Sequence, residues 1–248
     1  MAKQVLTNVR YFVGPADLTA QANKVELDDQ MEEKEVTNFG SEGAKEVIAG
    51  LESVAITAEG QYEAGDPGYA DEEWWGARRV IEAHTVGVHT ADIGSVAYLA
   101  EAVRLNGKLF GQVGDVAMFT LSAAGSKGLA RGAFLQSPAA ITGDADGTAV
   151  QMGAVSAGQR LVASLHVLSV AGTMVPELTV IIESDSAEAF DGSPETRIAF
   201  DTATAIGSQF KRTAVGAHTD TWYRASFGVE DNGGTGASFL VVVALAVL

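Results

Sequence analysis

The sequence is poor in cysteine, basic residues and long apolar runs, and each shortage excludes a class of protein. It has no cysteine, which excludes disulfide bonds, thiolate metal sites and a cysteine nucleophile. Its 16 Lys and Arg stand against 32 Asp and Glu, and the resulting net charge of −16 repels nucleic-acid phosphates. The most apolar stretch, residues 237–248, is too short for a transmembrane helix, which needs about 20 residues. Because the first residues also lack the apolar run of a signal peptide, we expect a soluble chain with no membrane partner.

Hydrophobic residues make up 47% of the chain, which is too apolar for a disordered acidic tail. The acids are concentrated in the first half: residues 1–124 hold 20 acidic and 9 basic residues, whereas residues 125–248 hold 12 and 7. The densest acidic segment has four members of interest: Asp28, Asp29, Glu32 and Glu33. Such a run is most simply a solvated face, and the alternative is a surface that must repel something anionic.

Short segments in which apolar and polar residues alternate dominate the chain, and this is the pattern of half-buried strands. Turn residues separate these segments. Many short strands separated by turn residues predict an all-β fold, a sandwich or barrel, with one or two short helices. We expect strands at residues 5–13, 54–59, 115–123, 161–170, 178–182, 197–200, 222–229 and 237–247, the last buried on both faces. We expect turns at residues 14–17, 65–68, 106–107, 143–147, 191–194 and 231–234.

Two segments have helical character. Residues 41–48 start with a possible Ser cap, although their glycines limit the length of any helix. Residues 71–83 are the better candidate, because Asp71 can cap the helix and two glutamates follow at its positive end. Its paired Trp74 and Trp75 are most simply core anchors, one of them at an interface.

Adjacent basic residues occur at only two places, Arg78-Arg79 and Lys211-Arg212. Neither pair is interleaved with aromatics as in a nucleic-acid patch. Both are most simply surface salt-bridge partners; at a subunit contact they would complement a neighbour's acidic face. Together with the two tryptophans, these four residues are the candidate interface.

The two halves of the chain resemble each other. Residues 54–60 align with residues 178–184, and residues 96–100 align with residues 221–225. This offset predicts a tandem duplication of one β unit, with domains at 1–124 and 125–248. The Gly- and Ser-containing stretch 124–128 is the expected boundary.

No catalytic or metal-binding signature is found. The four histidines form no zinc-binding pattern, and His166 sits in an apolar run typical of a core residue. Residues 144–148 resemble the start of a calcium loop, but the distal glutamate is missing, so a plain turn is expected. We therefore expect no enzyme activity, no metal and no cofactor.

Several stretches together carry a family resemblance. They are Asn8-Val9-Arg10-Tyr11-Phe12-Val13-Gly14, Val25-Glu26-Leu27, Thr37-Asn38-Phe39-Gly40-Ser41-Glu42-Gly43, Gly50-Leu51, Leu178-Thr179-Val180-Ile181-Ile182 and Trp222-Tyr223-Arg224-Ala225. In these stretches the chain resembles the major tail (tail tube) proteins of long-tailed, non-contractile bacteriophages, the siphoviruses. The region 129–160 departs from the family pattern, because it is rich in Ala and Gly and lacks the Thr-x-Phe-Gly-Ser motif.

The resemblance implies a structural subunit of the virion tail, assembled in the host cytoplasm. Its copies would form trimeric or hexameric rings that stack into the DNA ejection channel. The implied partners are further copies of itself, the tape measure, tail terminator and distal tail proteins, and double-stranded DNA that passes without tight binding. The acidic segment would then line the lumen or face the next ring. The alternatives are a capsid decoration protein, a tail terminator, and a β-sandwich binding module or hydrolase.

Overall fold

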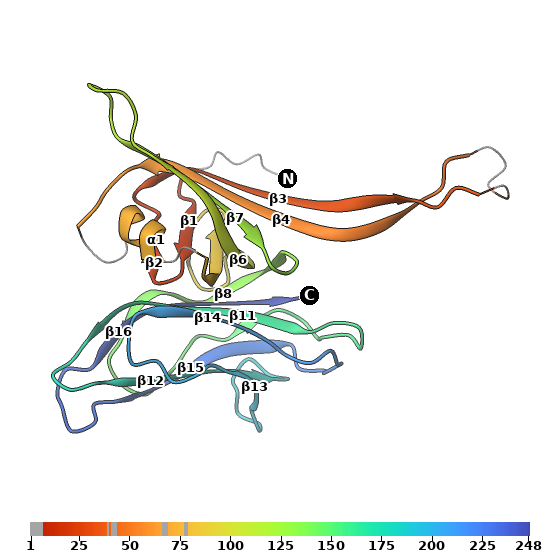
Figure 1. Ribbon diagram of the computed structural model, residues 1–248. Helices are drawn as coiled ribbons and strands as arrows, with labels where there is room; N and C mark the ends of the chain where they lie inside the picture. Colours follow the sequence, from red (N-terminus) through yellow and green to blue (C-terminus); the bar gives the residue numbers. More distant parts are fainter. Residues whose placement is uncertain (1–6, 39, 41–43, 66–68, 77–78) are drawn as a thin grey trace.

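The computed structural model describes residues 7–38, 40, 44–65, 69–76 and 79–248, and their regular structure is almost entirely β (Figure 1). The predicted all-β fold class is confirmed. One helix, α1 (Ala70–Gly76), occurs in this part of the chain, and no helix there is long and apolar enough to cross a membrane.

The strands form an 11-stranded and a 5-stranded sheet. In chain order they are β1 (Arg10–Val13), β2 (Ala16–Asp17), β3 (Ala22–Glu35), β4 (Val47–Gln61), β5 (Ile81–Gly87), β6 (Val96–Leu109), β7 (Met118–Gly125), β8 (Ala130–Ile141), β9 (Ala145–Asp146), β10 (Val150–Gln151), β11 (Leu161–Ala171), β12 (Glu177–Asp185), β13 (Glu195–Ala199), β14 (Gly207–Arg212), β15 (Trp222–Glu230) and β16 (Ser238–Val247).

The first half of the chain forms the upper body in Figure 1, from which the β3–β4 hairpin extends far beyond its neighbours. Strands β1, β2, β5, β6 and β7 and the root of the hairpin surround one apolar core, with Phe119, Ile56 and Leu18 buried inside it. The predicted turn at residues 14–17 is the tight connection between β1 and β2.

The second half forms a sandwich below it, in which β8, β16, β11 and β14 lie over the 5-stranded sheet (Figure 1). The alternate side chains of β16 divide between two cores. Val241, Val243 and Leu245 pack into the sandwich, whereas Val242 and Ala244 pack on the opposite face against the first half. The prediction that this strand is buried on both faces is confirmed.

Hydrogen bonding is continuous between the halves, because β8 pairs with β6 on one side and with β16 on the other. The close approach of β8 and β16 needs a glycine at position 132, where an added Cβ would lie 1.9 Å from the Leu245 carbonyl oxygen. The division into domains at 1–124 and 125–248, and the duplication, stay predictions.

Three local predictions in the first half are wrong. The helix predicted for 71–83 ends at Gly76, and Ile81–Gly87 form the buried strand β5 instead, since their β-branched side chains favour a strand. The turn predicted at Asn106-Gly107 lies inside β6, which continues past a register irregularity. Of the helix predicted for 41–48, residues 41–43 lie outside the described residues, and Val47 and Ile48 begin β4.

Candidate assembly surfaces

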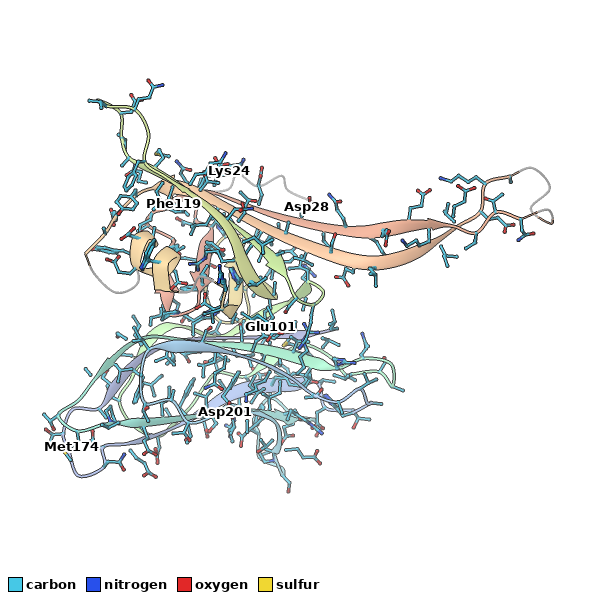
Figure 2. All side chains as sticks on the ribbon, in the orientation of Figure 1. Lys24, Asp28, Glu101, Phe119, Met174 and Asp201 are labelled. Atoms are coloured by element: carbon cyan, nitrogen blue, oxygen red, sulfur yellow. The ribbon has the colours of Figure 1, made fainter. Side chains whose placement is uncertain are left out.

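The most prominent surface is the arm, which we define as Asp28–Glu35 of β3 with Val47–Ala55 of β4, paired antiparallel. Figure 2 shows its side chains, Asp28 among them, projecting from a ribbon that pairs with β7 only at its root, through Ala55. At its root Val54 is buried against the body, whereas further out Leu51 is 79% exposed and Ile48 is 56% exposed. Apolar side chains held in water on a protruding ribbon are typical of a surface that a partner covers.

The four predicted acidic residues all lie on β3 within the arm, and all are exposed. Glu32 pairs with Lys34 and Glu33 pairs with Lys45, whereas Asp28 accepts a hydrogen bond of 2.8 Å from the Gln30 amide. Within the described residues Asp29 has no ion pair. Whether this segment lines a lumen or meets another ring stays a prediction.

A second exposed hairpin, the connection from β6 to β7, is a feature that the sequence analysis missed. Phe110, Val113 and Val116 are all more than half exposed there. The ring of Phe110 meets the Tyr62 ring edge-on, with centroids 4.9 Å apart. Val116 was expected in the strand at 115–123, but β7 begins at Met118, so Val116 belongs to the connection instead.

The candidate interface residues lie on separate elements. Trp75 in α1 is 65% exposed, and Arg79 follows it in a left-handed backbone conformation with φ of 68°. The structure describes the backbone of Trp74 but not its side chain, and Arg78 lies outside the described residues.

The other predicted basic pair, Lys211 and Arg212, ends β14 at the open edge of the 11-stranded sheet. Lys211 forms an ion pair of 2.6 Å with Asp201. Arg212 lies over the Phe210 ring, and its Nε and Nη2 are shielded from solvent without a hydrogen-bond partner. Guanidinium nitrogens that are shielded from water and lack acceptors are costly, so these two atoms of Arg212 reduce the stability of the folded chain.

A buried ionic cluster attaches α1 to the sheet. The Arg104 guanidinium of β6 lies 2.7 Å from Glu73 of α1 and 3.4 Å from Glu82 of β5, and it also donates to the Glu73 backbone carbonyl. Burial, followed by the neighbouring Glu73 carboxylate, raises the pKa of Glu82 to about 8. One arginine therefore balances one carboxylate while Glu82 keeps its proton at neutral pH.

Two buried histidines occupy polar positions, His84 inside the first half and His166 between the halves. The Tyr11 hydroxyl lies 2.9 Å from His84 Nδ1, and His166 makes hydrogen-bond contacts with the Thr85 hydroxyl and the Gly14 carbonyl. Burial lowers the pKa of His84 to about 3 and that of His166 to about 4. The prediction that His166 is a satisfied core residue is confirmed.

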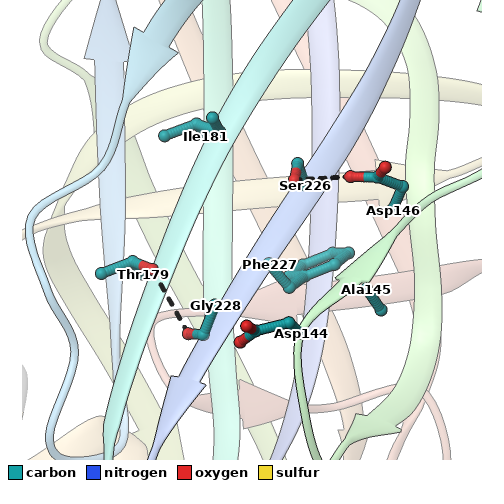
Figure 3. Close-up of a pocket in the computed structure, with 8 residues that line it drawn as sticks. All are labelled: Asp144, Ala145, Asp146, Thr179, Ile181, Ser226, Phe227 and Gly228. Atoms are coloured by element: carbon teal, nitrogen blue, oxygen red, sulfur yellow. Dashed lines mark hydrogen bonds between the residues drawn. The ribbon is translucent and has the colours of Figure 1, made fainter. Parts of the chain in front are cut away.

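The outer face of the 5-stranded sheet carries an open hollow of about 500 Å³ (Figure 3). Small residues of β15, Ser226 and Gly228, lie beside Thr179 of β12 and the acids of the 144–146 segment. Asp146 accepts from the Ser226 hydroxyl at 2.7 Å, and Asp144 accepts from the Val229 backbone amide at 3.0 Å.

These bonds hold the segment to β15, so Ala145 and Asp146 form the short strand β9 rather than the predicted plain turn. In the described part of the chain, no group of three or more His, Asp or Glu side chains is arranged to hold a metal ion.

The fold and these surfaces define an all-β protein with an exposed arm. No protein-family model matches the sequence, and no curated protein matches it. Several solved structures align with part or nearly all of this chain. A chain of a native gene transfer agent virion is 18% identical with a TM-score of 0.43, over 53% of this chain and 100% of its own.

Two further solved structures show how much identity and coverage vary. A chain from the sheath–tube complex of the extracellular contractile injection system PVC is 12% identical with a TM-score of 0.42, over 53% of this chain and 92% of its own. The Dit hub protein of phage SPP1 is 9% identical with a TM-score of 0.35, over 98% of this chain and 100% of its own.

Proposed function

We propose that this chain is a structural subunit of a siphovirus-type tail tube, whose copies form stacked rings around a channel for genome ejection. The observation that carries the proposal is the arm. Its strand β3 is paired on one side only, by β4, and its apolar residues stand in solvent. A two-stranded ribbon is marginally stable alone, and an open strand edge is a template for pairing with another chain.

The charge of the chain supports the same role. A conduit for DNA must surround the duplex without binding it, and a net charge of −16 disfavours phosphate contacts. In this proposal the virion tail is the site of action, with the tape measure, terminator and distal tail proteins at the ends of the tube. The tail and injection-system subunits named above would be functional counterparts.

Electron microscopy of the purified full-length chain tests the proposal. We expect rings or tubes at high protein concentration, because the arm has an unpaired edge and exposed apolar residues to bury. Replacing two of those residues, as in Ile48→Asp with Leu51→Asp, should abolish the assemblies while leaving the thermal unfolding of the body unchanged. Both side chains are more than half exposed, so the folded monomer loses little packing.

The matched control is Val175→Asp, which places an acid at a residue that is 63% exposed and lies outside the arm. It should assemble like the parent chain. A parent chain that stays monomeric at every concentration contradicts the proposal. Closed trimers that pellet with capsids, and never stack, favour a decoration protein instead.

A further inference from the structure

We infer that the open edge of β14 is the docking site for the arm of a second copy, whose β3 adds to the sheet as its next strand. This inference rests on the proposed function and names the partner surface of the arm. The two edges have opposite charge: β14 ends in Lys211 and Arg212, whereas β3 carries consecutive Asp28 and Asp29.

The β14 edge is unsatisfied in the isolated chain. In the described residues β14 has one strand partner, β11, and all six of its residues are only half-buried. Two nitrogens of the Arg212 guanidinium are shielded from water without an acceptor. A carboxylate placed beside the half-buried Arg212 brings the opposite charge to this edge.

Charge and shape together select one register. In an antiparallel pair, Asp28 of the second copy lies opposite Arg212, and that copy's Asp29 lies opposite Lys211. Two residues further along, Met31 of the second copy then lies opposite Gln209. Met31 is 60% exposed in the free arm, so it has apolar surface to bury.

A hollow of about 210 Å³ lies at that position, lined by Gln209 and by apolar residues that include Leu165, Val167 and Ile206. Lys211 and Gln209 share the face of β14 that looks into the sandwich, since their partners on β11, Ala163 and Leu165, belong to its core. Side chains alternate along a strand, so Asp29 and Met31 also share one face.

The antiparallel register therefore brings the exposed methionine to an apolar hollow while both charges are matched. A parallel pairing of the same charges carries Met31 beyond Arg212 and away from the hollow, and a slip by one residue turns it to the opposite face.

Cysteine cross-linking tests the register directly, because the chain contains no cysteine of its own. Chains with Asp29→Cys and chains with Lys211→Cys are mixed, assembled and oxidised. We expect a disulfide-linked heterodimer, since directly opposite Cβ atoms lie about 4.5–5.5 Å apart. The matched control is Glu35→Cys with Lys211→Cys, which stays unlinked because Glu35 lies six positions further along the arm.

Charge reversal tests whether the opposite charges on β3 and β14 stabilise the contact between copies. Asp28→Lys with Asp29→Lys should abolish tubes, and so should Lys211→Glu with Arg212→Glu, whereas one chain carrying all four changes should recover them. The control chain combines Lys211→Glu and Arg212→Glu with Glu32→Lys and Glu33→Lys. It should not recover tubes, because Glu32 and Glu33 do not lie opposite the basic pair.

Tubes that form normally but give no Asp29–Lys211 cross-link overturn the inference and leave the tail-tube proposal standing. Recovery of tubes by the control chain, in which Glu32, Glu33, Lys211 and Arg212 are reversed, also overturns the inference and leaves the tail-tube proposal standing. A parent chain that never assembles overturns the proposed function itself, so the two failures are distinguishable.

Discussion

At the scale of single residues, Gly132 shows how closely β8 and β16 approach. An added Cβ would meet the Leu245 carbonyl at 1.9 Å and the Ala246 Cα at 2.5 Å, both of them backbone atoms of the central strand β16. Backbone cannot move aside without breaking the β8–β16 ladder. Gly132→Ala should therefore destabilise the chain by about 3 kcal/mol or more, as measured by urea unfolding. Gly143→Ala is the control, since nothing lies within 4 Å of its added Cβ; equal midpoints for both variants contradict the prediction.

Glu82 gives a second residue-scale prediction, on pH. Its pKa is raised from 4.5 to about 8 in the folded chain by burial and the Glu73 carboxylate. The folded state therefore holds this proton more tightly than the unfolded state, and the associated stability is lost as pH rises through 8. The expected slope is at most about 1.4 kcal/mol per pH unit.

Glu82→Gln removes this titration, so its unfolding free energy should vary less than that of the parent between pH 6.5 and pH 8.5. The two buried histidines, with folded pKa values of about 3 and about 4, titrate near 6.5 when unfolded, but they contribute equally to variant and parent and cancel in the comparison. Parallel stability curves for variant and parent across the window contradict the assignment.

At the scale of elements, strands with clear alternation were predictable from the sequence. The expected strands within β11, β12, β15 and β16 are confirmed. β12 and β15 bury alternate side chains, whereas β11 and β16 come from apolar runs that are buried on both faces. β8 was not predicted, since an Ala- and Gly-rich segment has little strand propensity. β8 forms because it packs closely against β16. This is a tertiary contact, so it leaves no pattern in the local sequence.

The same distinction applies to the candidate surfaces. Composition predicted an exposed acidic segment, and Asp28–Glu33 is exposed, but nothing local indicated that it stands on a protruding arm. The ionic cluster of Glu73, Glu82 and Arg104 joins one helix to two strands, so its spacing matches no motif. The basic character of Lys211 and Arg212 was visible in sequence, whereas their position at an open sheet edge required the fold.

At the scale of the whole molecule, net charge and assembly oppose each other. Every added copy brings a charge of −16 to the growing tube, so subunits repel before their edges meet. Salt shortens this repulsion from a range of about 30 Å at 0.01 M to about 10 Å at 0.1 M, whereas ion pairs enclosed at a β3–β14 contact are screened much less. Assembly followed by light scattering should therefore accelerate between 0.01 M and 0.15 M NaCl. Sucrose of matched osmolality should have little effect, and assembly that slows steadily with added salt would show that surface charge attraction, rather than edge pairing and apolar burial, builds the tube.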